Sequence, residues 1–361
     1  MRFYDAIQLD PSCLKPKIRA SEDPKERRKL ALAMATRSIL IVLFAIMLIS
    51  PVSPIFGPEN SAMAVAMFCI FLGLRFVDFG YCIKDSLVNL GVTFLLLLIA
   101  PCAASVVNPI FAAIIHFVAF FIILFMTSDS PEMGNAGIYT FAYIYLSGNP
   151  VTGDLLWQRA ILTLVGYVLC AVLMFAKHRK KNKDVRFWDM VARFSMTNKK
   201  TQWHIQLALG VGLILALGSF LQLKRMMWAA FACGSILGCY SATSVEAKSR
   251  VGQRMAGAVA GSLIFFFGYQ MTPEALRPIF GPLGGICLGF CTDYRFKTAC
   301  NCLGALFMAT SLYGVSGSVF LRVLNNLLGV AFGYVFLVLY QKVMSTCFNS
   351  STQGGAEDPA V

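Results

Sequence analysis

Long apolar segments follow one another along nearly the whole chain, and no other feature constrains its fold as strongly. A helix needs about 20 apolar residues to cross a bilayer, because backbone polar groups find no water inside the hydrocarbon. Charged residues make up only 14% of the sequence, against about 25% in soluble domains. The sequence therefore predicts an all-α polytopic membrane protein with about 12 transmembrane helices, and it excludes a large domain outside the membrane. The predicted spans are 38–55, 61–76, 86–101, 104–127, 136–148, 156–176, 204–222, 226–242, 252–270, 276–292, 298–313 and 319–341.

Two basic stretches orient these spans. Residues 1–37 and 177–200 each contain nine Lys or Arg, and such stretches favour the cytoplasmic side. Six spans in each half then place both termini in the cytoplasm. The predicted parts are a basic N-terminal tail (1–37), a first six-helix repeat (38–176), a basic linker (177–202), a second six-helix repeat (203–342) and a disordered C-terminal tail (343–361).

The two sets of six spans share short patterns at a nearly constant separation. Arg159 precedes Gly166 by seven residues, as Arg322 precedes Gly329, and the Pro-Ile-Phe of 109–111 recurs at 278–280. Because each half has an even number of spans, both halves enter the membrane from the same side. The pattern therefore predicts two parallel repeats, with a substrate path where they meet.

The basic linker alternates aromatic and charged residues at nearly helical spacing. Phe187, Trp188 and Phe194 interleave with Lys183 and Arg186. This pattern is typical of a helix that lies on the anionic inner leaflet of the lipid bilayer. Its position between two spans argues against nucleic-acid binding, which also uses basic and aromatic residues.

Ionisable groups at the rims of spans are candidate functional residues, because burying a charge in hydrocarbon is costly. Arg159 and Arg322 begin the sixth and twelfth spans, and Asn325 and Asn326 lie one turn beyond Arg322. We expect the two guanidinium groups to bind a carboxylate near the outer face. The alternative is that each long side chain simply reaches the membrane interface.

A second group of charges lies at the cytoplasmic ends of the spans. Positive-inside topology alone accounts for its basic residues, which are also candidates for collecting an anion, but topology does not require the carboxylates. We expect these acidic groups to carry protons, with a histidine in the fourth span as a further relay, although that histidine could instead bond two helices. The substrate-binding candidates are Arg75, Arg250 and Arg254; the proton-coupling candidates are Asp78, Asp85, Glu246 and His116.

Cysteine spacing and catalytic motifs predict neither a metal site nor an enzyme. The 12 cysteines include no Cys-x-x-Cys and lie mostly in apolar runs, where thiols act as small hydrophobes. Cys287 and Cys291 are one turn apart with Cys300 and Cys302 nearby, but the nearest histidine is His204. No phosphate loop or metalloprotease motif occurs, so we expect no cofactor.

One stretch resembles a known signature. Arg254, Gly257 and Gly261 form an Arg-x-x-Gly-x-x-x-Gly pattern, which is similar to that of the fusaric acid resistance and aromatic acid exporter family. The resemblance implies a bacterial inner-membrane exporter of aromatic or other weak carboxylic acids. It also implies proton drive, a periplasmic adaptor and an outer-membrane channel.

Two departures from that family are visible. Larger members carry sizeable cytoplasmic domains, whereas this chain is similar to compact members without them. In the first half, Val88 stands at the arginine position of the motif and Gly91 near its glycine position. The role of the motif arginine therefore falls to Arg254 alone.

These observations predict an efflux transporter for small organic anions, and they leave homo-oligomers open. The alternatives are an anion channel, which would carry current without a proton requirement, and a membrane scaffold without transport. A membrane-embedded enzyme acting on lipid head groups would need a cluster of carboxylates or histidines with metal-binding spacing. Asp78, Asp85 and Glu246 lack that spacing.

Overall fold

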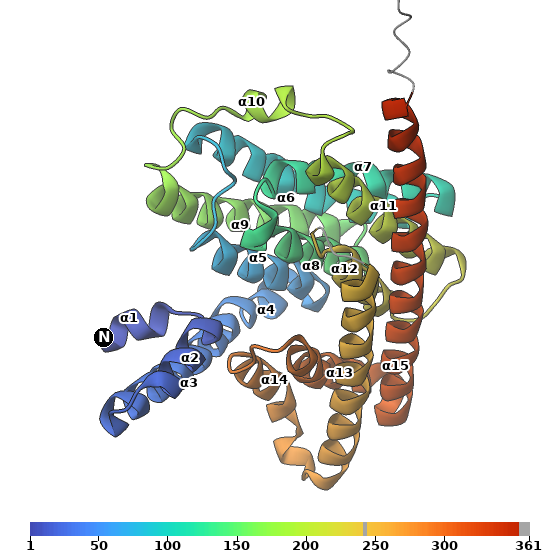
Figure 1. The fold of residues 1–361 in the computed structure, drawn as a ribbon. Coiled ribbons are helices and arrows are strands. Elements are labelled where there is room, and N and C mark those ends of the chain that lie inside the picture. The colour runs from blue at the N-terminus through green and yellow to red at the C-terminus, as the bar shows by residue number, and fades with distance from the viewer. Residues whose placement is uncertain (241–243, 354–361) are drawn as a thin grey trace, which may run out of the picture. The chain divides into compact units, whose positions relative to one another are not determined.

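Helices are the only regular elements among residues 1–240 and 244–353, which the computed structural model describes (Figure 1). Seven helices are long and apolar enough to cross a membrane, so the chain is a multi-pass membrane protein. The helices are α1 (Phe3–Gln8), α2 (Pro11–Ala20), α3 (Pro24–Ile49), α4 (Val52–Phe56), α5 (Ser61–Leu74), α6 (Ile83–Ser105), α7 (Pro109–Thr127), α8 (Asn135–Ser147), α9 (Asp154–His178), α10 (Phe187–Ala192), α11 (Lys199–Phe220), α12 (Met227–Leu237), α13 (Ser244–Met271), α14 (Phe280–Leu288) and α15 (Tyr294–Gln353), with 3-10 turns η1 (Pro58–Asn60), η2 (Pro131–Met133) and η3 (Glu274–Ile279).

Each of the twelve predicted apolar ranges overlaps a helix, but several of these helices are short. α12 and α14 have 11 and 9 residues, fewer than a bilayer crossing needs. α15 contains the last two predicted spans, and Gly314, with φ of 67° and ψ of 175°, interrupts its helical geometry between them. The end of the predicted span 226–242 lies outside the described residues.

Capping residues explain where several helices begin. Asp10, Asp23 and Asn108 each accept a hydrogen bond from a backbone N–H of the first turn, and proline follows each of them at the first helical position. Proline has no N–H to leave unpaired there, so this pairing is a strong start signal.

The chain divides into two compact units that do not follow the predicted repeats. Unit 1 comprises Met1–Ser50 and Arg250–Leu327, and unit 2 comprises Pro51–Ser249 and Leu328–Val361. Helix α3, from the first predicted repeat, thus shares unit 1 with α14, from the second. The repeat relation itself stays a prediction.

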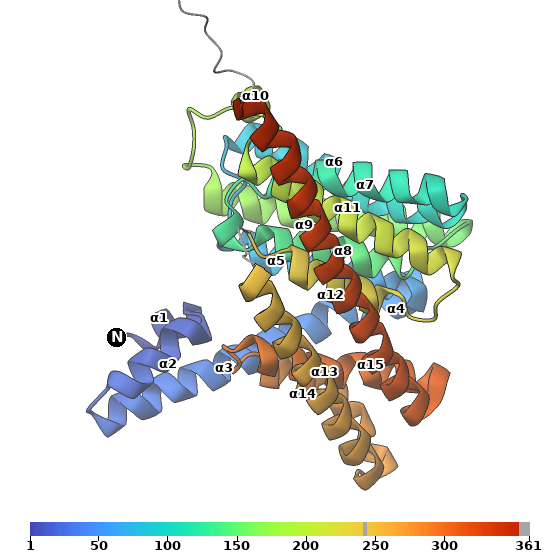
Figure 2. The same cartoon turned by 45° about the vertical axis from the view of Figure 1, so that its right-hand side comes forward.

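In unit 1 the predicted basic N-terminal tail is largely helical. Helices α1 and α2 pack against the first half of α3 (Figures 1 and 2), where Ala6, Leu14 and Leu30 are buried and Phe290 joins them. Farther along α3, Ser38 lies against Gly289, where an added Cβ would come within 2.7 Å of the serine Cβ. Sequence-distant helices α3 and α14 are therefore in direct contact.

In unit 2, α6, α7 and α11 run side by side (Figure 2), and α5 packs on α8 and α9. The sequence predicts a helical linker over 177–202. Between the end of α9 at His178 and the start of α11 at Lys199, this linker contains one short helix, α10. The predicted disordered tail 343–361 is helical as far as Gln353, and its last residues lie outside those described.

Candidate functional site

Arg254 lies on the buried face of α13 and contacts α15 on both sides of the interruption at Gly314. Its Nε donates to Asn326 Oδ1 at 3.0 Å, and its Nη1 donates to the Tyr294 hydroxyl at 3.2 Å. Only 9% of Arg254 is exposed. Both partners are neutral, so they orient the guanidinium without cancelling its charge.

Arg250, one turn earlier on α13, faces the same tyrosine. Its guanidinium carbon lies 4.2 Å from the centre of the Tyr294 ring, within cation-π distance. Its Nε is buried and makes no hydrogen bond among the described residues. Within that part of the chain, neither Arg250 nor Arg254 forms an ion pair with a carboxylate. Among the described residues, two cations therefore contact one tyrosine, one at its ring and one at its hydroxyl, without acidic partners.

Glycines set the distance between the helices that carry these groups. Gly257 and Gly261 follow Arg254 on one face of α13, at i+3 and i+7. A Cβ added to Gly257 would lie 2.7 Å from Thr298 Cβ, and one added to Gly261 would lie 2.7 Å from Ala299 Cα. The backbones of α13 and α15 are thus in contact. The signature places an arginine beside a helix crossing that only glycine permits.

The predicted residues of the twelfth span are all buried. Arg322 is 4% exposed, and Asn325 and Asn326 are nearly fully buried. Asn326 joins the site, since its Oδ1 accepts from Arg254 and its Nδ2 donates to the Arg322 carbonyl at 2.7 Å. Asn325 instead donates to the Leu321 carbonyl at 2.8 Å. The structure therefore brings Arg250, Arg254 and Asn326 together.

Arg159, the predicted counterpart of Arg322, is 1% exposed and bound on three sides. Its Nε donates to Asn60 Oδ1 at 2.8 Å, and its Nη1 and Nη2 donate to the carbonyls of Asn149 and Glu59, both at 2.7 Å. These partners come from η1 and from the chain after α8. The contacts give Arg159 the role of tying the start of α9 to two loops.

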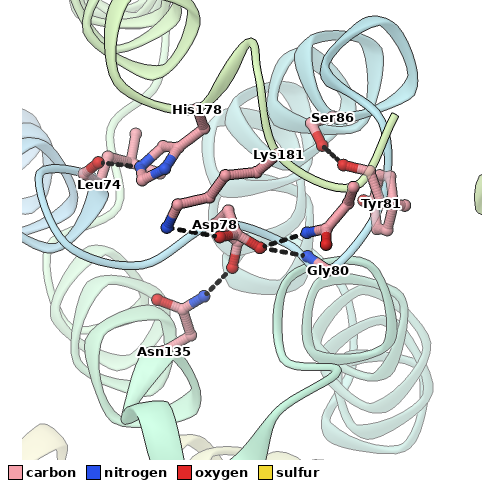
Figure 3. A network of polar contacts seen from close by, with 9 residues as sticks. Leu74, Asp78, Gly80, Tyr81, Ser86, Asn135, His178 and Lys181 are labelled. Carbon is pink, nitrogen blue, oxygen red and sulfur yellow. Dashed lines mark hydrogen bonds and ion pairs between the residues drawn. The ribbon is translucent and has the colours of Figure 1, made fainter. Parts of the chain in front are cut away.

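Asp78 lies in a polar network at the end of α5 (Figure 3). Its carboxylate accepts from the Gly80 N–H at 2.9 Å, from Asn182 Nδ2 at 2.9 Å and from Lys181 Nζ at 3.2 Å. Its backbone carbonyl accepts from Asn135 Nδ2 at 3.2 Å. Asp78 therefore attaches the linker after α9 to the loop between α5 and α6.

Asp85 attaches the next part of the linker. Arg186 donates from Nε at 2.9 Å and from Nη2 at 3.2 Å to its two oxygens, and the Phe187 N–H donates to it at 2.9 Å. The Phe187 ring then packs on Tyr81, with 5.4 Å between centroids. Asp78 and Asp85, two of the carboxylates that topology does not require, thus have structural partners. Proton coupling through them stays a prediction.

The charge state of Asp78 follows from these contacts. Burial alone raises the pKa of its carboxyl, but the hydrogen bonds from Gly80 and Lys181 and the charge of Lys181 outweigh burial and lower the pKa below its ordinary value. A lowered pKa stabilises the folded state above the ordinary carboxyl pKa of about 4, and this stability is lost as pH falls through the folded value.

We therefore expect Asp78→Asn to loosen the linker at neutral pH. Losing this partly exposed ion pair costs about 1 kcal/mol, which corresponds to roughly fivefold faster tryptic cleavage after Lys181 or Lys183. Glu132→Gln, an exposed carboxylate on η2, is the matched control. In the wild type, hydrogen exchange over 179–186, corrected for intrinsic rates, should rise only below about pH 4. Unchanged cleavage with a shifted pH profile of transport would instead favour proton coupling.

The remaining candidates, His116, Arg75 and Glu246, belong to unit 2. His116, on α7, is buried, and its Nδ1 is 2.9 Å from the Tyr143 hydroxyl, which joins α7 to α8. Arg75 is partly exposed at the end of α5, with its guanidinium over the neighbouring Phe76 ring at 5.3 Å. Glu246 is exposed on the first turn of α13. Among the described residues, no group of three or more His, Cys, Asp or Glu could hold a metal ion.

The arginine cluster lies within a segment that matches a known family. Residues 213–336 match the family model of fusaric acid resistance protein-like proteins, and these residues include the whole of the Arg254, Tyr294 and Asn326 cluster. The family resemblance is confirmed. With the apolar helices, the match to the fusaric acid resistance protein-like family indicates a membrane transporter. No curated protein and no solved structure matches the chain.

The fusaric acid resistance protein-like segment also contains a residue that sequence reasoning missed. Tyr294 binds Arg254 through its hydroxyl and Arg250 through its ring. The available signal was an aromatic residue beside the charged residues Asp293 and Arg295, shortly before the predicted span 298–313. Neither the arginine motif nor the repeat pattern includes that position.

Proposed function

We propose that the protein exports small organic anions, such as aromatic or weak carboxylic acids, across a bacterial inner membrane. In this proposal the spans form two parallel six-helix repeats with both termini in the cytoplasm. Inward proton movement drives export, and a periplasmic adaptor and an outer-membrane channel carry the anion onward. The family match over residues 213–336 supports the class of transporter.

The observation that carries the proposal is the pair of guanidinium groups around Tyr294. Buried charges are normally paired, and an unneutralised cation in a membrane protein marks a binding site or an ion path. Asn326 and Tyr294 hold the Arg254 guanidinium in place, so its remaining N–H groups can donate hydrogen bonds to a carboxylate. Arg250 adds a second positive charge on the same ring.

The test is anion flux in proteoliposomes, with radiolabelled benzoate as the probe. Losing one charge-assisted contact costs about 1.5–3 kcal/mol, so Arg254→Gln should lower uptake at subsaturating benzoate at least about tenfold. Arg254→Lys keeps the charge but loses the planar donor set, and we expect it to recover only part of the activity.

Arg295→Gln is the matched control, because it removes the same charge from an exposed position beside Tyr294. Thermal unfolding in detergent establishes that each variant is folded. Wild-type flux in a folded Arg254→Gln variant would contradict the assignment. Benzoate current that persists without a proton gradient would show a channel in place of a coupled exporter.

A further inference from the structure

Two thiols that the proposed function does not use lie in contact near Tyr294. Cys291 follows α14, Cys300 lies two turns into α15, and their sulfur atoms are 3.6 Å apart. Both side chains are partly exposed, and every described cysteine is a free thiol. A disulfide bond is about 2.05 Å long, so the sulfurs need to approach by only about 1.5 Å.

In the described part of the chain, the neighbouring Cys302 and Cys287 form no sulfur–sulfur hydrogen bond. Cys302 is fully buried, and its sulfur donates to the carbonyls of Thr298 at 3.4 Å and Ala258 at 3.8 Å. Cys287 contributes its backbone carbonyl, which accepts from the Cys291 thiol at 3.3 Å. These residues therefore serve as internal controls for the pair.

The two thiols lie on different parts of the chain. Cys291 is in the segment before α15 and Cys300 is on α15, and the charged residues Asp293, Arg295 and Lys297 separate them in the sequence. The thiolate is the form of cysteine that reacts with peroxide. We assign Cys291 as the attacking thiol and Cys300 as the resolving thiol.

We propose that Cys291 and Cys300 form an oxidisable dithiol that closes to a disulfide when a hydroperoxide is present. The Cys291 thiolate attacks a peroxide oxygen, which breaks the O–O bond, gives a sulfenic acid and releases one water after protonation. The Cys300 thiolate then attacks that sulfur, forms the S–S bond and releases the second water. In total, two thiols are oxidised and one hydrogen peroxide is reduced to two waters.

The disulfide would act on the anion site through Tyr294. It closes a loop that contains Tyr294 and draws Cys291, in the segment before α15, toward Cys300 on α15. The Tyr294 hydroxyl, now 3.2 Å from Arg254 Nη1, moves with that loop. This regulatory consequence rests on the proposed function, whereas formation of the disulfide does not.

The first measurement is the bond itself. Purified full-length protein is treated with hydrogen peroxide, its free thiols are blocked, and it is digested with trypsin without reduction. Trypsin cleaves after Arg295 and Lys297, so a Cys291–Cys300 disulfide gives two peptides joined through sulfur, which dithiothreitol separates. We expect this species in the wild type, in Cys302→Ser and in Cys287→Ser, and its loss in Cys291→Ser and in Cys300→Ser. Its absence from folded, peroxide-treated wild type overturns the proposal.

The second measurement is benzoate flux before and after oxidation. We expect peroxide to reduce wild-type flux about fivefold, the lower end of ordinary coupling between two sites. Dithiothreitol should restore it, and Cys291→Ser should be insensitive. Flux that stays unchanged when the disulfide is fully formed overturns the regulatory part. If the reduced protein carries no benzoate, the proposed function fails while the disulfide result stands.

Discussion

Replacing Arg159 by alanine should lower the free energy of unfolding by about 3–5 kcal/mol. The substitution leaves three buried acceptors without their donor, namely the side-chain oxygen of Asn60 and the carbonyls of Glu59 and Asn149. Each unsatisfied buried group costs about 1–3 kcal/mol. Arg159→Lys should recover only part of the loss, because one ammonium cannot reach acceptors on all three sides. The measurement is thermal unfolding in detergent.

Lys177→Ala is the control for Arg159, since it removes an exposed positive charge from the same helix. We expect its unfolding midpoint to stay close to that of the wild type. If Arg159→Ala unfolds like the wild type but transports benzoate poorly, Arg159 binds substrate as the sequence predicts. The unfolding curve and the flux therefore separate a structural arginine from a binding one.

Gly261→Ala should also lower the free energy of unfolding strongly. The cause here is a steric clash, not the loss of hydrogen bonds. Its new Cβ would lie 2.7 Å from the Cα of Ala299 and closer still to the carbonyl oxygen, and backbone atoms cannot turn aside. Helices α13 and α15 must then separate, which costs about 1–3 kcal/mol or more. We expect a lower unfolding midpoint and, because Arg254 moves away from Asn326, loss of benzoate flux.

Gly252→Ala supplies the opposite result on the same helix. Gly252 is exposed, and nothing lies within 4 Å of an added Cβ. Alanine is a better helix former than glycine by about 1 kcal/mol, so this variant should be unchanged or more stable. Equal changes in the unfolding midpoint at positions 252 and 261 would show that helix propensity determines the stability of these variants, and that the close crossing of α13 and α15 does not.

Local patterns were the predictable part of this protein. Apolar runs predicted where helices lie, because each run must satisfy its backbone inside the bilayer. The Arg254, Gly257 and Gly261 spacing predicted that these residues share one face of a helix, because it depends on positions within two turns of one helix. Tyr294 was not predicted, because its place in the site depends on how α15 crosses α13. The spacing of residues within one segment does not specify that crossing.

Partners distant in sequence were the unpredictable part. Asp78 and Asp85 bind Lys181 and Arg186 about a hundred residues later, so the sequence alone left their charges without partners. Arg159 could not be distinguished from a substrate clamp, since its acceptors are two backbone carbonyls and an asparagine, which carry no charge signal. The N-terminal helices were missed because they fold against α3 and Phe290, not through their own propensity.

The contact of Ser38 with Gly289 bears on how this protein is made. A ribosome releases α3 long before α14 exists, and at about 5–20 residues per second the delay is on the order of tens of seconds. During that time α3 has only α1 and α2 of its unit 1 neighbours. Neither compact unit is one continuous stretch of chain, so cutting the gene between the predicted repeats would separate helices that belong together. Assembly of unit 1 therefore waits until residues 250–327 have been synthesised.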